Sequence, residues 1–180
     1  MCIYSVFMVV NVSPRPHSVG MKKPVELFYF FHIANAANFK TALKTNVIPL
    51  VTSTATLISP AASQPLAFLN IGFSQSGLTA LGITDNLGDT TFAAGQFADA
   101  TSLGDVQSDW ETPYAGTSIH GVLLIGSDLQ TRIDALLSSL TGYFGASITK
   151  VTSIQGAARP GSQAGHERQS LLHIVRGSHD

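Results

Sequence analysis

The sequence predicts an α+β fold: a ferredoxin-like split β-α-β domain whose antiparallel sheet carries its helices on one face. Strand-like and helix-like segments follow one another in the order β-α-β, an insertion, and β-α-β. Two segments repeat apolar side chains with the period of an α-helix. The chain has 180 residues, of which 44% are hydrophobic, so it can bury the core of one domain.

The first predicted strand covers residues 25–33, which are dense in aromatic and β-branched side chains. Asn35 is a candidate N-cap for the helix that follows. Pro49 should fall near the end of this helix or kink it. A loop rich in Ser, Thr, Ala and Pro is expected over residues 52–64. The apolar face of the helix is marked at every fourth position, by Phe39, Leu43 and Val47.

The second predicted strand covers residues 66–73 and is apolar on both faces, so we expect it to be central in the sheet. Residues 74–81 should turn into a short helix, and the apolar side chains of residues 92–100 suggest another. Residues 105–117 are expected to form an irregular connection that carries the only tryptophan, Trp110.

The third predicted strand covers residues 119–125. Residues 127–130 match the capping box S-x-x-Q and should begin an amphipathic helix, closed by Gly142 or Gly145. Alternating apolar side chains predict the fourth strand over residues 147–154. The apolar positions of the helix are Leu129, Ile133, Leu136, Leu137 and Leu140.

Composition and charge exclude several classes of function. Ten Lys+Arg against eleven Asp+Glu predict no strongly basic surface, and hence no nucleic-acid partner. The single cysteine, Cys2, excludes an internal disulfide framework and a cysteine-based metal centre. The apolar stretch 2–10 is too short to span a membrane, and as a signal peptide it lacks a basic start and a cleavage site. We expect no membrane association, and the sequence leaves the compartment open, an extracellular location included.

No motif for metal binding or catalysis is complete. Six acids between residues 85 and 111 lack the spacing of a calcium loop, so we expect them in solvated loops and at helix starts. His32 and His120 lie in predicted strands and should be hydrogen-bonded rather than ligands. His166 and Glu167 resemble the start of H-E-x-x-H, but position 170 is Ser. Nucleophile-elbow, phosphate-loop and dinucleotide patterns are absent.

Several segments, in order, resemble the fungal dye-decolorizing (DyP-type) haem peroxidases. They include N-I-G-F-S-Q-S-G-L-T-A-L-G-I at 70–83, G-T-S-I-H-G-V at 116–122 and R-P-G-S-Q-A-G-H-E at 159–167. Each segment alone is weak, but the ordered series is specific and covers residues 19–167. The full set is Val19–Lys23, Glu26–Phe31, Leu69–Ile83, Phe92–Ala100, Gly116–Val122 and Gln155–Glu167.

The resemblance implies an enzyme built from two ferredoxin-like halves, with haem b held mainly by the C-terminal half. Family members use H₂O₂ to oxidise dyes, phenolics and other aromatic donors. Their machinery is an Asp within G-x-x-D-G, a distal Arg and a proximal His on the iron. The carboxylate would take a proton from peroxide, and the cation would stabilise charge as the O–O bond breaks.

The chain departs from the family pattern at both ends. The family places G-x-x-D-G almost directly after the segment that resembles Gly165–Glu167, but residues 168–180 differ and Asp180 is not within that motif. No family role carries over to His173 or Arg176. We therefore expect a divergent extension (1–18), an N-terminal ferredoxin-like domain (19–167) and a divergent tail (168–180), as in an altered gene model or a truncated paralogue.

This division predicts no catalytic, cofactor-binding or metal residue in the chain, no retained haem and no activity by itself. The alternative is a non-catalytic ferredoxin-like binding or dimerisation module, which would self-associate through the sheet face that no helix covers. The strands that start at Val25, Leu66, Ile119 and Ile148 would line that face. A third interpretation, an unrelated small-molecule binder of the same fold, requires the family resemblance to be accidental.

Overall fold

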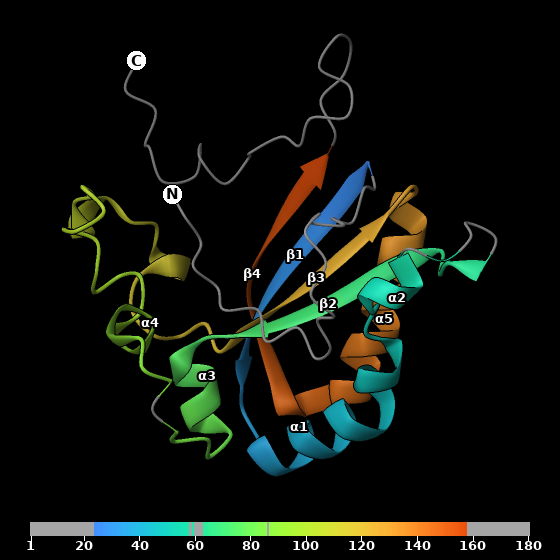
Figure 1. Ribbon diagram of the computed structural model, residues 1–180, viewed down its shortest axis with the longest axis horizontal. Helices are drawn as coiled ribbons and strands as arrows, with labels where there is room; N and C mark the ends of the chain where they lie inside the picture. The colour runs from blue at the N-terminus through green and yellow to red at the C-terminus, as the bar shows by residue number, and fades with distance from the viewer. Residues whose placement is uncertain (1–23, 58, 60–62, 86, 158–180) are drawn as a thin grey trace, which may run out of the picture.

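The computed structural model describes residues 24–57, 59, 63–85 and 87–157 and contains one four-stranded sheet (Figure 1). The strand order is β2-β3-β1-β4, and each neighbouring pair is antiparallel. Two β-α-β units interleaved in this order are the ferredoxin-like arrangement, so the predicted fold class is confirmed. The strands are β1 (Val25–Ile33), β2 (Ala67–Phe73), β3 (Gly121–Ser127) and β4 (Ile148–Ala157).

Two helices, α1 (Ala36–Ala42) and α5 (Gln130–Phe144), lie on the same face of the sheet (Figure 1). Asn35 caps α1 as predicted, because its Oδ1 accepts the Asn38 backbone N–H at 3.0 Å. The helix continues as a π-helical turn and then as a 3-10 turn that contains Pro49. Pro49 therefore lies at the end of the helical segment, as expected from its missing N–H.

The core lies between these helices and the sheet and is built around aromatic rings. Phe39 of α1 stacks on Phe144 of α5 with ring centroids 4.8 Å apart and an interplanar angle of 7°. Phe31 of β1 packs against both rings, and all three side chains are buried. Stacked aromatic pairs stabilise a core beyond the area they bury, so this cluster joins the two helices to the sheet.

The prediction that the second strand is central was wrong, since β2 is an edge strand. Its side chains are buried on both faces: Leu69 and Ile71 face the helices, and Phe68, on the opposite face, is 3% exposed. A strand that is apolar on both faces is covered by other parts of the protein above and below the sheet. The pattern does not show whether the strand has neighbouring strands at both edges.

The predicted capping box at residues 127–130 was also wrong. Ser127 is the last residue of β3, and its Oγ donates to the Leu66 carbonyl at 2.7 Å. The N-cap of α5 is Leu129, which makes no side-chain cap and is 49% exposed, so it does not belong to the buried face. Asp128 instead pairs with Arg132 one turn later at 2.6 Å. Gly145, with φ of 52°, ends the helix.

Other elements differ from the prediction mainly at their ends. Within the expected loop 52–64, residues Thr54–Leu57 form the one-turn helix α2. The helix expected over 92–100 is α4 (Thr90–Ala94), which stops at Gly95 because that residue has a φ of 81°. β3 begins two residues later than predicted, so His120 precedes the strand. The short helix α3 (Gln75–Ala80) is confirmed, with Ser74 as its N-cap.

Some predicted features fall in parts of the chain that the structure does not describe. Residues 1–18, with Cys2 and the apolar stretch, lie outside the described residues. The tail 168–180 and the His166-Glu167 pair do so as well. Among the described residues, no helix has the length and apolar character to cross a bilayer.

Gly77 of α3 should tolerate no side chain. A Cβ there would lie 1.8 Å from the His120 carbonyl oxygen, whereas a Cβ on the exposed Gly142 of α5 would meet no atom within 4 Å. We expect Gly77→Ala to lower the free energy of unfolding by about 3 kcal/mol. The matched Gly142→Ala should raise it by about 0.5–1 kcal/mol through helix propensity. Urea unfolding monitored by circular dichroism measures both, and equal effects would contradict the close approach.

Candidate functional site

The insertion between β2 and β3 folds back toward the helix-free face of the sheet. The Tyr114 ring makes an edge-to-face contact with Phe30 of β1, with centroids 5.8 Å apart and an angle of 89°. The Tyr114 hydroxyl also hydrogen-bonds Thr152 of β4. Burial of the ring raises the pKa of Tyr114 above its ordinary value; the Thr152 hydrogen bond opposes this shift and the Glu111 carboxylate adds to it. One aromatic side chain therefore attaches the insertion to two strands.

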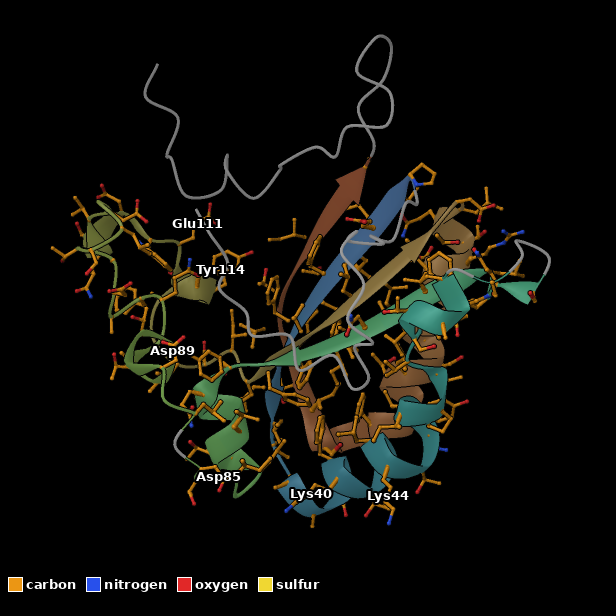
Figure 2. The ribbon with its side chains drawn as sticks, viewed as in Figure 1. Lys40, Lys44, Asp85, Asp89, Glu111 and Tyr114 are labelled. Carbon is orange, nitrogen blue, oxygen red and sulfur yellow. The ribbon has the colours of Figure 1, made fainter. Side chains whose placement is uncertain are left out.

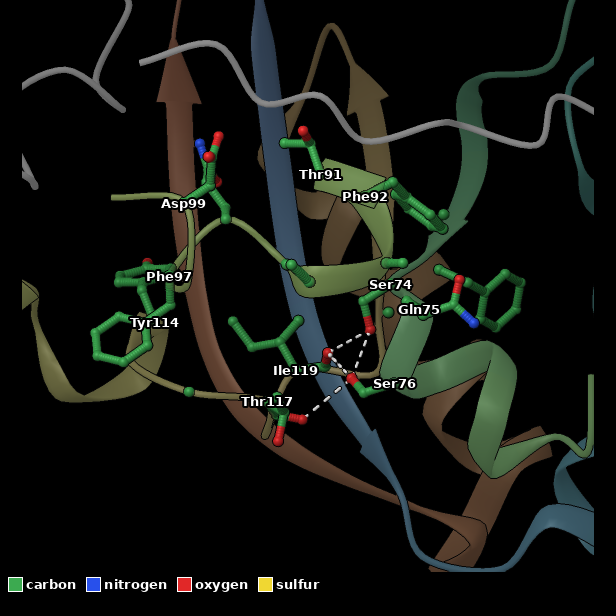
Figure 3. Close-up of a pocket in the computed structure, with 18 of the residues that line it drawn as sticks. Ser74, Gln75, Ser76, Thr91, Phe92, Phe97, Asp99, Tyr114, Thr117 and Ile119 are labelled. Carbon is green, nitrogen blue, oxygen red and sulfur yellow. Dashed lines mark hydrogen bonds between the residues drawn. The ribbon is translucent and has the colours of Figure 1, made fainter. Parts of the chain in front are cut away.

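A cavity of about 680 Å³ lies between this insertion and the sheet (Figure 3). Its walls come from the ends of β1, β2 and β3, from α3 and α4, and from residues 95–117. Figure 3 shows Phe97 and Tyr114 on one side and Ser74, Gln75 and Ser76 on the other. The aromatic side chains that line it are Phe30, Phe73, Phe92, Phe97, Trp110 and Tyr114.

Two serines on the α3 side hold the cavity wall together. Ser74 Oγ donates to the Ile119 carbonyl at 2.7 Å and accepts the Gly77 N–H at 3.1 Å. Ser76 Oγ donates to the Thr117 carbonyl at 3.2 Å (Figure 3). These hydroxyls join the start of α3 to the chain entering β3. Their other partner is each other, at 2.9 Å between the two Oγ atoms, so neither serine has the adjacent base of an activated nucleophile.

Among the described residues that line the cavity, the charged side chains are both acidic, Asp89 and Asp99. Asp89 is the N-cap of α4 and accepts the Phe92 N–H at 2.8 Å, which confirms the helix-start role expected for one of the six acids. Figure 2 shows Asp85, Asp89 and Glu111 on the side of α3, α4 and the insertion. The described residues contain no group of three or more His, Cys, Asp or Glu side chains placed to hold a metal ion.

His32 and His120 form a stacked pair outside the cavity. Their ring centroids lie 3.9 Å apart, with an interplanar angle of 32°. His120 Nδ1 accepts the backbone N–H of Ile33 at 3.0 Å, and His32 Nδ1 lies 3.1 Å from the Ser118 carbonyl. The hydrogen-bonded role predicted for both is confirmed. Burial, and secondarily the neighbouring His32, lower the pKa of His120.

The cavity itself was not predicted from the sequence. The signal that could have found it is the run of aromatic side chains at positions 92, 97, 110 and 114, which lie in or beside irregular segments. An irregular segment has no periodicity from which the direction of a side chain can be derived. The sequence therefore does not show that these rings converge.

The family model described as the DyP dimeric α+β barrel domain matches residues 18–160, so the chain belongs to this family. It is 50% identical over 154 residues to a dye-decolorizing peroxidase of Auricularia auricula-judae, a match that covers 86% of this chain and 30% of that protein. It is 46% identical over 154 residues to a dye-decolorizing peroxidase of Mycena epipterygia, covering 86% and 29% of the two chains.

Solved structures show the same relationship. A dye-decolorizing peroxidase in complex with 2,6-dimethoxyphenol superposes with a TM-score of 0.79 and 57% identity, over 82% of this chain and 34% of that one. The enzyme of Auricularia auricula-judae superposes with a TM-score of 0.79 and 50% identity, over 83% and 33%. The family inferred from the sequence is therefore confirmed, and the chain spans about 30% of the length of its curated relatives.

The His32–His120 pair should make the stability of the chain depend on pH. In the unfolded chain His120 gains a proton near its ordinary pKa of 6.5, whereas burial of the ring, and secondarily the neighbouring His32, lower the pKa of His120 in the folded chain. Its contribution is therefore complete above pH 6.5 and is lost as the pH falls from that value toward the lowered pKa of the folded state.

Urea unfolding at a series of pH values from about 7.5 to about 5.5 measures this effect. We expect the free energy of unfolding to fall with the pH in the wild type, and to fall less steeply in His120→Gln, which does not titrate. The two chains differ at position 120 alone, so the comparison isolates the effect of His120. Parallel curves for the two proteins would contradict the expectation.

Proposed function

We propose that this chain provides the N-terminal ferredoxin-like half of a haem-dependent peroxidase that uses H₂O₂ to oxidise dyes, phenolics and other aromatic donors. The observation that carries the proposal is the family match over residues 18–160, together with a fold that superposes on the corresponding third of solved dye-decolorizing peroxidases. We assign residues 19–167 to this domain and treat 1–18 and 168–180 as divergent extensions.

The described residues do not fit haem b as an axially ligated group. The two described histidines are His32 and His120, and neither lines the cavity. His120 Nδ1 already accepts a backbone hydrogen bond, and its ring stacks on His32. A haem iron needs an imidazole nitrogen, a thiolate or a phenolate that faces an open space. Tyr114 lines the cavity, but its hydroxyl is bonded to Thr152. The role we propose for this domain is to pack beside haem-binding elements and not to supply the ligand.

The 180-residue chain should bind no stoichiometric haem and show negligible peroxidase turnover. Titration of the purified chain with haemin should give no protein-bound Soret band with an imidazole-ligated spectrum, and adding H₂O₂ should not bleach an aromatic dye. A saturable one-to-one Soret band accompanied by peroxide-dependent bleaching would overturn this expectation. A dye-decolorizing peroxidase that contains both ferredoxin-like halves is the positive control.

A second candidate function is non-catalytic self-association, favoured by the helix-free face of the sheet and by the matched family's description as a dimeric α+β barrel domain. Phe28 and Leu124 on this face are half-buried, and no helix of the described residues packs over them (Figure 1). Two such sheets facing each other would cover these side chains. In this alternative, a second copy of the chain packs on this face of the sheet.

Sedimentation velocity over a range of concentrations tests this alternative. Self-association through the sheet should appear as a sedimentation coefficient that rises with concentration, and Leu124→Asn should weaken the association by at least about tenfold through loss of apolar burial. Leu129→Asn is the matched control, because Leu129 is exposed at the start of α5 and lies off this face. A wild-type chain that stays monomeric at high concentration would exclude self-association through this face.

A further inference from the structure

Two imidazole rings join β1 to the chain entering β3 at the point where the regular pairing of the two strands ends. That pairing ends at Phe31 of β1. Two residues further along β1, the Ile33 N–H donates to His120 Nδ1 at 3.0 Å. His32 Nδ1 lies 3.1 Å from the Ser118 carbonyl, and the two rings stack with centroids 3.9 Å apart. Side chains therefore satisfy backbone groups of both segments beyond the end of the ladder.

The partner atoms assign the proton on each neutral ring. The Ser118 carbonyl can only accept, so His32 Nδ1 must carry the proton to bond with it. The Ile33 N–H can only donate, so His120 Nδ1 must be bare and the proton of that ring is on Nε2. The two stacked rings are therefore opposite tautomers, and each bond requires the tautomer that its own ring adopts.

Protonation has different effects on the two rings, because an imidazolium has two N–H donors and no acceptor. A charged His32 still donates to the Ser118 carbonyl. A charged His120 directs an N–H against the Ile33 N–H, and turning the ring over restores no acceptor because both nitrogens carry protons. Ile33 is buried, so its N–H would then be left without a partner. The junction between the strands is therefore sensitive to the protonation of His120.

The surroundings of the His120 ring contain one other titratable group, His32 of β1, whose charge acts on it. Residues 74–80, at the start of α3, include no Asp, Glu, Lys, Arg or His. Lys150 of β4 pairs with Phe31, but its Nζ lies over the Tyr29 ring, 5.8 Å from the centroid. Both histidines are half-buried, so protons from solvent can reach them.

We propose that His120 is a pH-sensitive switch at the junction of β1, α3 and the chain entering β3. The neutral ring closes the junction, and protonation of the ring opens it locally while the rest of the sheet stays paired. Residues 117–120 are then released from Ile33. Ser74 and Ser76 bond to this segment, so the opening also loosens the cavity wall that they hold.

The switch is distinct from the pH dependence of global stability, which follows from burial of the ring alone. Its local character comes from the bond to Ile33. It needs no haem, so its test is independent of the proposed peroxidase function. Long-range ¹H–¹⁵N spectra of the histidine side chains at about pH 8 should show His120 Nδ1 bare and His32 Nδ1 protonated. A proton on His120 Nδ1 at this pH would overturn the proposal.

Amide hydrogen exchange, measured as the pH is lowered through the titration of His120, tests the local opening. Protection factors correct each amide for its intrinsic rate at each pH. We expect protection at Ile33 to fall at least about tenfold more than at Leu27 and Tyr29, in the middle of the same strand. Equal losses at the three amides would mean that the sheet opens as a whole, which would overturn the switch.

Two variants separate the roles of the rings. His120→Asn replaces Nδ1 with Oδ1, which accepts at every pH, so Ile33 should keep its protection relative to Leu27 as the pH falls. His32→Asn is the matched control, because it keeps a donor for Ser118 and removes the neighbouring charge. The switch should persist in it with a midpoint at higher pH, since His32 lowers the pKa of His120. An unchanged pH response in His120→Asn would contradict the proposal, and the wild-type measurements decide it even where a variant does not fold.

Discussion

The arrangement of the domain depends on a backbone junction at His120. The His120 N–H donates to the Phe31 carbonyl of β1, and the His120 carbonyl accepts the Ser74 N–H at the start of α3. The ring of the same residue accepts the Ile33 N–H through Nδ1, and Gly77 packs directly on its carbonyl group. One residue thus joins β1, the chain entering β3 and α3. Any change that moves it displaces three elements at once, because buried backbone groups must keep their partners.

The two faces of the sheet on either side of this junction are covered in different ways. On one face, Phe31, Phe39 and Phe144 form a closed aromatic core with α1 and α5. On the other face, cover comes from the irregular insertion, held by the contacts of Tyr114 with Phe30 and Thr152. Irregular segments leave space that regular helices fill, which explains why the cavity lies on the insertion side. Ser74 and Ser76 define its wall because they connect α3 to residues 117–119.

Family membership and the local chemistry of the described residues support different conclusions. Residues 18–160 match a domain of dye-decolorizing peroxidases, and the chain spans about 30% of the length of such proteins. The two described histidines contact the backbone and each other. The cavity beside Trp110 is a separate feature of this domain, and its described lining residues include six aromatic side chains and two carboxylates.

By itself, the sequence determined the features that depend on local periodicity and capping: the four strands, the two main helices, the Asn35 cap and the ferredoxin-like order. It also indicated the family, because ordered motifs are a property of the chain. Tertiary structure alone decided that β2 is an edge strand. A side-chain pattern shows which faces of a strand are covered, but not which strands lie beside it. The tertiary structure likewise made Ser127 the last residue of β3 rather than a helix cap, because pairing with β1 and β2 extends through this residue. The cavity around Trp110 also depends on the tertiary structure, because aromatic rings from irregular segments converge only when the sheet brings those segments together.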